Sequence, residues 1–411
     1  MEQSNHEYIC SYYGNEQVLR FWLSEFTELA AYIPETQFLP NEFKETKYDL
    51  IVLSSRDLQI NTANSKKVLT ISQYIELLLA NSLIMPHKLR IDFSTLCQLN
   101  CRDCYMRLSN SGTMGKGYLS FENFKKLIDD NPYIREIETS NSGELFLNPD
   151  LVKIIKYAFE HNVILTAYNG VNFNSVTDEQ LDALVRYRFG GLVLSIDGGS
   201  EEVYAKYRQN GSFSNVVDNI KKLIAIKERY NSSYPILRWQ YIIMEDNEED
   251  IPNAKRWAEK LGIRIEFKLT WNKSYQPKNV AFLQKETGLS SFTREDQSKP
   301  QPYFGYLKCI QLYLSPQINW DGRLLGCCNL YKEDYEINVF DVGLREALSS
   351  FRYIAAKKYM LFRENSENAT FPCLLCNTNK KMLLANTNLS VINTMYGKDE
   401  APDPIMYIPY S

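Results

Sequence analysis

The sequence has few glycines and prolines, no surplus of basic residues and no long apolar run. With 18 Gly and 15 Pro among 411 residues, and with 44% hydrophobic residues, it is neither collagen-like nor disordered. The 46 Lys+Arg against 50 Asp+Glu give a net charge of -4, which leaves no large positive field for nucleic acid or an anionic membrane. We therefore expect a folded globular protein, of two or three domains at roughly 100–200 residues each, that binds neither nucleic acid nor membrane.

An export signal is also missing. The start, MEQSNHEYIC, has no basic region followed by an apolar one, and no run of about 18 uncharged apolar residues occurs in the sequence. We therefore expect a cytoplasmic protein, in which thiols stay reduced. Its nine cysteines then indicate metal binding or redox chemistry rather than disulfides. Three of them cluster early and five late, so the sequence predicts two separate sites.

Short apolar strands alternate with amphipathic helices from Arg90 to about Phe267. Strands are expected at residues 89–93, 136–139, 163–167, 191–196, 238–243 and 264–269. Helices are expected at residues 120–129, 148–161, 177–187, 214–230 and 251–261. This alternation is typical of a parallel sheet built from strand-helix-strand crossovers, and six units favour a partial (β/α)6 barrel over a closed eight-stranded one. Catalytic groups of such folds lie at the carboxyl ends of the strands.

The remaining chain divides around this α/β barrel, which is expected over residues 86–275. Residues 1–85 predict a small α/β unit, with strand-like runs at 48–53 and 67–71 and a helical stretch at 18–29. It loosely resembles a shortened Rossmann-like module, but only Gly14 stands where a dinucleotide fingerprint needs several glycines. A domain with the late cysteines is expected over 300–385, and an extended tail over 386–411. Asp321-Gly322 predicts a hairpin turn within 314–327.

The early cysteines, Cys97, Cys101 and Cys104, lie on one loop directly after the first barrel strand. They are close enough to bind three irons of one [4Fe–4S] cluster and to leave the fourth iron open. This CX3CX2C spacing resembles that of the radical SAM superfamily, in which the fourth iron holds the amino and carboxylate groups of S-adenosylmethionine (SAM). A zinc knuckle is the alternative, but the nearest histidine, His87, comes before the strand.

Further motifs at the strand ends are similar to those of this superfamily. Ser142-Gly143-Glu144 resembles the Gly-Gly-Glu motif that engages the SAM amino group, with Ser142 in place of the first glycine. Asn169-Gly170 resembles the Thr-Asn-Gly turn. Asp103 stands where the superfamily has an aromatic residue against adenine, so we expect Tyr105 or residues 239–244 to contact adenine instead.

A later segment resembles the one found in superfamily members that carry a SPASM domain. It runs Ser195-Ile196-Asp197-Gly198 and continues with Tyr204, Tyr207 and Arg208. The resemblance implies that Ser195 and Arg208 hold the ribose or carboxylate of SAM. The full set of residues for which it implies cofactor contacts is Tyr105, Ser142, Gly143, Glu144, Asn169, Ser195, Asp197 and Arg208.

The late cysteines Cys309, Cys327, Cys373 and Cys376 resemble the C-terminal auxiliary-cluster domain of SPASM and twitch enzymes. No cysteine follows Cys376, so the resemblance implies one auxiliary [4Fe–4S] cluster. Four ligands complete its coordination and favour electron transfer. A structural zinc site is the alternative.

Two cysteines have no place in either cluster. Cys328 is a candidate catalytic residue, because a thiol near a radical site can donate a hydrogen atom to a substrate radical, as radical SAM epimerases require. The alternative is a Cys-Cys pair without such a role. Cys10 is expected to be a buried hydrophobic residue.

The resemblance implies that reductive cleavage of SAM yields a 5′-deoxyadenosyl radical, which abstracts hydrogen from the substrate. The spacing of the late cysteines resembles twitch-type alcohol dehydrogenases, so we expect an oxidoreductase acting on a small, polar, sugar-like substrate, with the auxiliary cluster taking an electron. One alternative is maturation of a ribosomal peptide by crosslinking or epimerisation. Another is a non-catalytic iron–sulfur or zinc scaffold. A reducing partner such as flavodoxin or ferredoxin is expected.

Overall fold

The computed structural model describes residues 10–13, 35–37, 50–53, 67–70, 78–79, 81–108, 114–270, 272, 274–292, 311–328, 333–362, 369–376 and 379. The chain forms two compact units, which are described separately. The barrel unit comprises Lys88–Gln301 and Gln317–Leu344, and the second unit comprises Met1–His87, Pro302–Pro316 and Arg345–Pro409.

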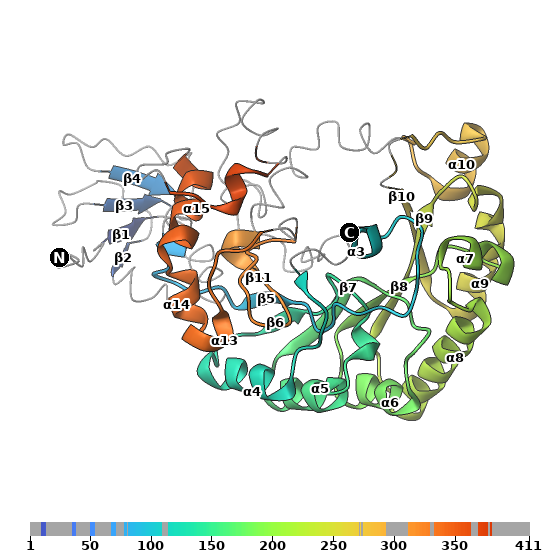
Figure 1. Ribbon diagram of the computed structural model, residues 1–411, viewed down its shortest axis with the longest axis horizontal. Coiled ribbons are helices and arrows are strands. Elements are labelled where there is room, and N and C mark those ends of the chain that lie inside the picture. Colours follow the sequence, from blue (N-terminus) through green and yellow to red (C-terminus); the bar gives the residue numbers. More distant parts are fainter. Residues whose placement is uncertain are drawn as a thin grey trace. The chain divides into compact units, whose positions relative to one another are not determined.

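A curved parallel sheet of seven strands forms the barrel unit, in the order β10-β9-β8-β7-β6-β5-β11 (Figure 1). The first six strands in the chain are β5 (Lys88–Ile91), β6 (Glu136–Glu138), β7 (Ile164–Val171), β8 (Gly191–Ser195), β9 (Ile236–Ile243) and β10 (Arg264–Leu269). They confirm the six predicted strands and the partial barrel. β7 is longer than predicted, because its pairing with β8 resumes at Val171 after a register shift beyond Ala167.

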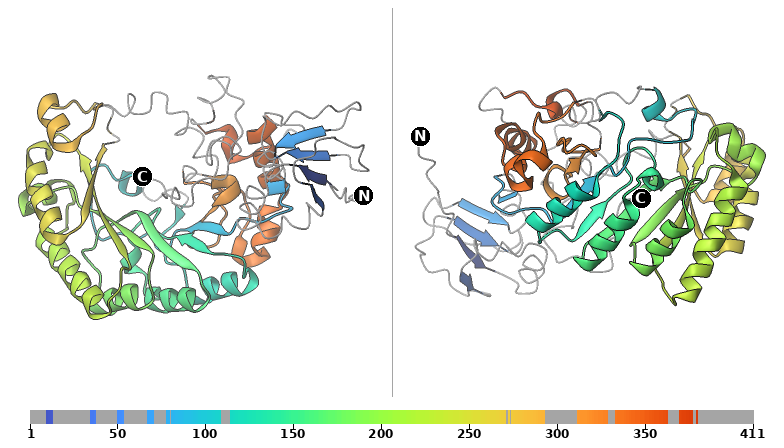
Figure 2. Two further views of the ribbon diagram at one scale, coloured as in Figure 1. Left: turned by 180° about the vertical axis from the view of Figure 1, so that it is seen from behind. Right: turned by 60° about the horizontal axis from the view of Figure 1, so that its bottom comes forward.

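Helices cover the convex face of this sheet, as Figure 2 shows for the barrel unit. They are α4 (Phe121–Asp130), α5 (Leu151–Glu160), α6 (Asp178–Arg186), α7 (Glu201–Tyr207), α8 (Phe213–Arg229) and α9 (Ile251–Leu261), and α10 (Val280–Thr287) follows β10. Their starts follow local chemistry: Ser120 caps α4, and Thr177 forms a capping box with Gln180 at α6. α5 begins three residues later than predicted, because Asn148 instead donates hydrogen bonds to the Phe93 and Leu119 carbonyls.

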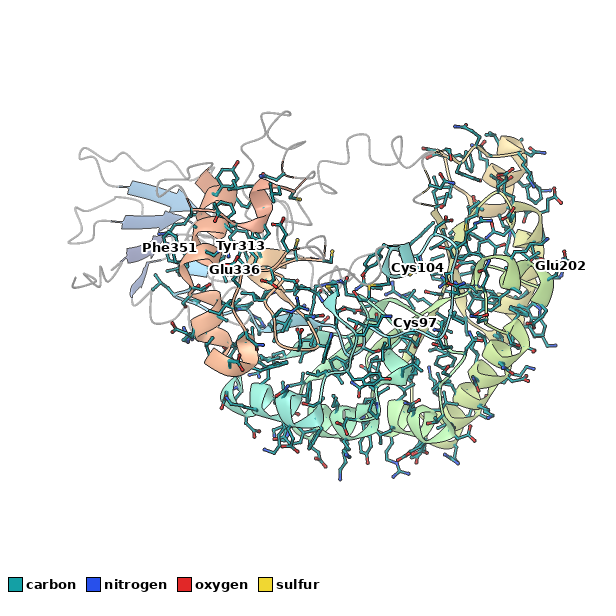
Figure 3. All side chains as sticks on the ribbon, viewed as in Figure 1. Cys97, Cys104, Glu202, Tyr313, Glu336 and Phe351 are labelled. Carbon is teal, nitrogen blue, oxygen red and sulfur yellow. The ribbon has the colours of Figure 1, made fainter. Side chains whose placement is uncertain are left out.

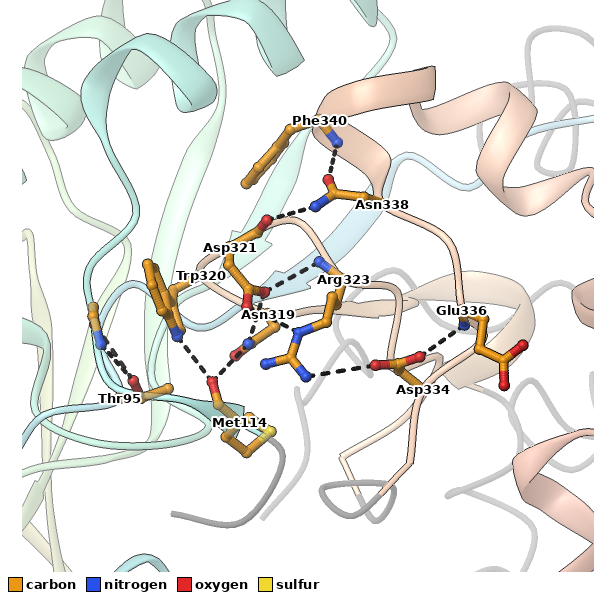
Figure 4. A network of polar contacts seen from close by, with 11 residues as sticks. Thr95, Met114, Asn319, Trp320, Asp321, Arg323, Asp334, Glu336, Asn338 and Phe340 are labelled. Atoms are coloured by element: carbon orange, nitrogen blue, oxygen red, sulfur yellow. Dashed lines mark hydrogen bonds and ion pairs between the residues drawn. The ribbon is translucent and has the colours of Figure 1, made fainter.

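The seventh strand, β11 (Gln317–Ile318), comes from the predicted hairpin and pairs with β5. The turn at Asp321-Gly322 is confirmed, since Ile318 pairs antiparallel with Leu324 and Gly322 has a φ of +93°. Figure 4 shows how this hairpin is fixed: Asn319 Nδ2 and Trp320 Nε1 each donate to the Met114 carbonyl at 2.9 Å. The sequence placed this stretch with the late cysteines, whereas the structure places it in the barrel sheet.

The second unit contains a four-stranded parallel sheet, ordered β2-β1-β3-β4. Its strands are β1 (Cys10–Tyr13), β2 (Glu35–Gln37), β3 (Leu50–Leu53) and β4 (Lys67–Thr70). β3 and β4 confirm the two predicted strands, β1 and β2 were not predicted, and the predicted helix at 18–29 lies outside the described residues.

Helix α15 (Phe351–Phe362) of the second unit carries a buried lysine. Lys357 Nζ donates to the Leu79 carbonyl and the Ser82 hydroxyl, both at 2.7 Å, and more weakly to the Leu348 carbonyl at 3.4 Å. These bonds fasten the segment that leads to the barrel onto α15. Short helices complete the described chain, namely α3 (Tyr105–Leu108), η3 (Leu145–Leu147), η4 (Glu248–Asp250), α13 (Val339–Val342), α14 (Leu344–Leu348) and η5 (Pro372–Leu374). Among the helices described, none has both the length and the apolar composition needed to cross a membrane.

Candidate functional site

The early cysteines lie at the carboxyl end of the barrel, on the loop between β5 and α3. Figure 3 shows Cys97 and Cys104 near each other on the concave side of the sheet. Desolvation, with a smaller contribution from negative charge on Glu144, Cys101 and Cys104, raises the pKa of the Cys97 thiol to about 12. The pKa of Cys101 is raised in the same way. Thiols such as Cys97 and Cys101, which resist ionisation, are suited to a positively charged metal centre, which removes their protons.

The polypeptide holds this loop in place by contacts on its other side. The amide of Asn100 donates to the Gln209 carbonyl at 2.9 Å, and the Asn100 side chain donates to Gln209 Oε1 at 3.3 Å. Arg102 Nη1 forms an ion pair with Asp246 Oδ2 at 2.6 Å. The loop is thus anchored to segments that follow α7 and β9.

Two predicted site residues meet in a buried ion pair beside the loop. Arg208 Nε and Nη2 lie 2.7 and 2.5 Å from Asp197 Oδ2. Asp197 is fully buried, and its other oxygen accepts from the amide of Ile242 at 2.8 Å. The third guanidinium nitrogen, Nη1, donates to Cys101 Sγ at 3.6 Å. Arg208 therefore faces the cysteine loop.

Glu144 is buried between the cysteine loop and β7. Its amide donates to the Leu96 carbonyl at 2.7 Å, and its carboxylate accepts from the amides of Asn172 at 2.8 Å and Phe146 at 3.3 Å. Burial raises its pKa to about 7 despite these donors. The preceding Gly143 has a φ of +64°, and a Cβ there would lie 2.8 Å from the Leu96 carbonyl oxygen, so glycine is needed to bring Glu144 to this place.

Tyr105 and Ser142 are also brought together. The Tyr105 hydroxyl and Ser142 Oγ share a hydrogen bond of 2.6 Å. Burial raises the pKa of Tyr105, and the charges of Asp92, Cys104 and Cys328 raise it further. Cys328 is therefore close enough to Tyr105 to act on it electrostatically.

Asn169 and Ser195 occupy the ends of β7 and β8. Asn169 Nδ2 donates to Glu138 Oε1 at 3.2 Å. Gly170, next in sequence, has a φ of +114°, and a Cβ there would lie well inside van der Waals contact with Ser195 Oγ. Glycine at 170 lets β7 and β8 approach at the point where the superfamily's turn was expected.

Two buried carboxylates in this region were not predicted. Glu138 accepts hydrogen bonds from Ser140, Thr166, Tyr168 and Asn169, which fixes the chain between β6 and β7. Asp92, at the end of β5, is fully buried, and burial raises its pKa to about 7 although Gln317 Nε2 donates to it at 2.8 Å. Each is an acidic residue next to apolar strand residues, and that mismatch is the sequence signal that could have identified them.

The late cysteines are distributed over both units. Cys327 is buried and Cys328 half-buried in the barrel unit, whereas Cys373 is buried and Cys376 half-buried in the second unit. Cys309 lies outside the described residues. Across the described parts of the chain, no three His, Cys, Asp or Glu side chains are arranged to hold a single metal ion.

Comparisons with known proteins relate the barrel unit to a family. Residues 91–238 match the family model "Radical SAM superfamily". The chain is 27% identical over 195 residues to the antilisterial bacteriocin subtilosin biosynthesis protein AlbA of Bacillus subtilis, covering 45% of this chain and 40% of AlbA. It is 30% identical over 142 residues to the mycofactocin maturase MftC of Mycobacterium tuberculosis, covering 34% of this chain and 35% of MftC. The chain thus spans less than half the length of either curated relative.

Solved structures extend the similarity over most of the chain at the level of fold. Streptococcus suis SuiB bound to S-adenosylmethionine aligns with a TM-score of 0.54, covering 82% of this chain and 81% of SuiB at 12% identity. SuiB bound to its precursor peptide SuiA aligns with a TM-score of 0.53, covering 86% and 85% of the two chains, also at 12% identity. At such identity the alignment establishes the shared fold, and the partial barrel is confirmed.

Proposed function

Residues 91–238 belong to the radical SAM superfamily, and from this premise we propose that the chain is an enzyme that binds a [4Fe–4S] cluster through Cys97, Cys101 and Cys104. The observation that carries the proposal is the anchored loop at the barrel's carboxyl end, which brings three cysteines together with side-chain N–H donors directed at two of their sulfurs. Bound together, the cluster and SAM supply a carbon-centred radical that removes a hydrogen atom from the substrate. The protein binds and orients the reactants and keeps water out.

We assign Glu144 to the amino group of SAM. Each of its oxygens accepts a hydrogen bond from one backbone amide, and its charge lies close to Cys97. An ammonium group beside it would lower its pKa from about 7 and hold it ionised. Ser142, Asn169 and Ser195, which lie at neighbouring strand ends, are proposed to contact the rest of the cofactor.

A peptide is the substrate that we propose. The curated relatives are named for biosynthesis of a bacteriocin and for maturation of mycofactocin, and SuiB has been crystallised with a precursor peptide. The expectation of a sugar-like substrate finds no support among these proteins, whereas the alternative, peptide maturation, does. The maturation reaction is proposed to be an oxidation, with an auxiliary cluster on Cys309, Cys327, Cys373 and Cys376 as electron acceptor and a flavodoxin or ferredoxin as reductant.

The test begins with anaerobic reconstitution of the full chain, followed by iron analysis and incubation with SAM and dithionite. We expect about eight irons per chain and formation of 5′-deoxyadenosine. The variant with Cys97, Cys101 and Cys104 replaced by alanine should lose half of the iron and all deoxyadenosine. A wild-type protein that binds iron but never cleaves SAM would refute the proposed function.

The reaction class is tested with a candidate precursor peptide and mass spectrometry in deuterated water. An oxidation removes two hydrogens and lowers the peptide mass accordingly. Epimerisation leaves the oxidation state unchanged and introduces solvent deuterium, and it would then depend on Cys328 as hydrogen donor. Deoxyadenosine production that no peptide stimulates would contradict the peptide proposal, and sugars would then be tested in the same assay.

A further inference from the structure

Two side chains from different parts of the barrel direct N–H groups at the sulfurs of the early cysteines. Asn172, just after β7, places Nδ2 3.8 Å from Cys97 Sγ. Arg208, just after α7, places Nη1 3.6 Å from Cys101 Sγ. These two thiolates therefore have hydrogen-bond donors that belong to neither the cysteine loop nor the backbone.

Other contacts fix the amide orientation of Asn172. Its Oδ1 accepts from Gln98 Nε2 and from the amide of Asn174, both at 2.9 Å. Its own backbone amide donates to Glu144 Oε2 at 2.8 Å. Because the backbone amide of Asn174 can only donate, it fixes the oxygen end, and the nitrogen end, which also donates to Gln98 Oε1 at 3.4 Å, faces Cys97.

Arg208 is held just as firmly. One carboxylate oxygen of Asp197 accepts from both Nε and Nη2 of Arg208, and the other oxygen accepts from the backbone amide of Ile242. Because the guanidinium is planar, these contacts also fix the position of Nη1, which points at Cys101 Sγ. Only 13% of the Arg208 side chain is exposed, so its charge acts on the sulfur with little screening.

We propose that Asn172 and Arg208 set the reduction potential of the cluster by hydrogen bonding to two of its three thiolates. This inference rests on the proposed function, since it requires a cluster on these cysteines. Reduction adds one negative charge, part of which resides on the sulfurs, so N–H donors and a nearby positive charge stabilise the reduced form more than the oxidised form. Asn172 and Arg208 thus make the cluster easier to reduce, and they are positioning residues rather than catalytic ones.

The test is a redox titration of the reconstituted protein without SAM, followed by electron paramagnetic resonance. The signal that changes when SAM is added identifies the cluster on the early cysteines. Asn172→Ala removes a neutral hydrogen-bond donor to Cys97, and Arg208→Lys keeps the positive charge but removes the planar guanidinium that donates to Cys101. Gln209→Ala is the matched control, because it removes a contact to the same loop through Asn100 and touches no sulfur.

We expect the midpoint potential to become more negative in Asn172→Ala and in Arg208→Lys, by up to a tenfold loss in the equilibrium constant of reduction, or about 59 mV for one electron. Gln209→Ala should keep the wild-type potential. Unchanged potentials in both variants at full iron content would overturn the inference and leave the proposed function intact. Loss of iron from both variants would also overturn it, since the residues would then build the site rather than tune it. Absence of a cluster from the wild type would instead refute the proposed function.

Discussion

Replacing Gly170 with alanine tests whether the close approach of β7 and β8 shapes the cofactor site. The residue has a φ of +114°, a conformation that costs a side-chain-bearing residue about 1–3 kcal/mol. The added Cβ would also overlap Ser195 Oγ, while Ser195 Cβ at 3.6 Å and Gln240 Nε2 at 3.9 Å would remain in ordinary contact. The steric conflict is thus confined to one hydroxyl group.

Because the steric conflict is confined to one hydroxyl group, its effect on stability can be measured apart from that of backbone strain. We expect Gly170→Ala to lower the unfolding free energy by about 2–4 kcal/mol, from backbone strain plus displacement of the hydroxyl, and to weaken SAM binding at least tenfold because Ser195 is moved. Adding Ser195→Ala removes the overlapping atom and should recover the steric part of the lost stability, but not the part due to φ. SAM binding should stay weak in the double variant, because the hydroxyl is gone.

Urea denaturation and equilibrium dialysis with labelled SAM measure the two quantities on the reconstituted protein. Ser195→Ala alone is the control for loss of the hydroxyl without strain. If the double variant were no more stable than Gly170→Ala, the clash with Ser195 would not be the source of the damage. If Ser195→Ala bound SAM as well as the wild type, Ser195 would have no role in cofactor binding.

Three further predictions concern other parts of the chain. Burial lowers the pKa of Lys357 from 10.5 to about 7, so between these pH values the unfolded chain binds more protons and stability rises with pH. The difference in unfolding free energy between the wild type and Lys357→Met should therefore change by about 1.4 kcal/mol per pH unit from pH 8 to 9.5. A difference that stays constant with pH in urea titrations would refute this prediction. Gly117→Ala puts a Cβ 2.7 Å or less from ring atoms of Trp320 and should cost about 1–3 kcal/mol by displacing the hairpin, so unchanged thermal unfolding would contradict the packing. Glu144→Gln keeps the shape but removes the charge, and should weaken SAM binding by roughly 1.5–3 kcal/mol at unchanged iron content, whereas equal binding in dialysis would remove Glu144 from the cofactor site.

The regular part of the barrel could be predicted because its signals are local. β10 was predicted to the residue, since its boundaries are marked by Gly262 before it and by the polar segment from Thr270 after it. The start of α6 was one residue off because the capping residue Thr177 was counted as helical. Periodicity and capping depend on neighbours a few positions apart, so the sequence displays them directly.

Contacts between distant segments could not be predicted in this way. β11 has only two residues, and its place beside β5 depends on bonds from Gln317 to Arg90 and Asp92, more than 220 positions away in sequence. The ion pair of Asp197 with Arg208 was likewise not predicted. Both residues were assigned to the cofactor by resemblance, and nothing in their spacing showed that one would hold the other.

The three buried carboxylates at this end of the barrel share one feature that bears on the chemistry. Asp92, Glu138 and Glu144 each accept hydrogen bonds from protein N–H groups. At least one oxygen of each is bound by a structural donor, which holds the carboxylate in one orientation. SAM carries a sulfonium and an ammonium group, so it is a cation that buried carboxylates stabilise without proton transfer. The arrangement thus matches the proposed role of this end of the barrel, which is to hold a cationic cofactor in a fixed orientation.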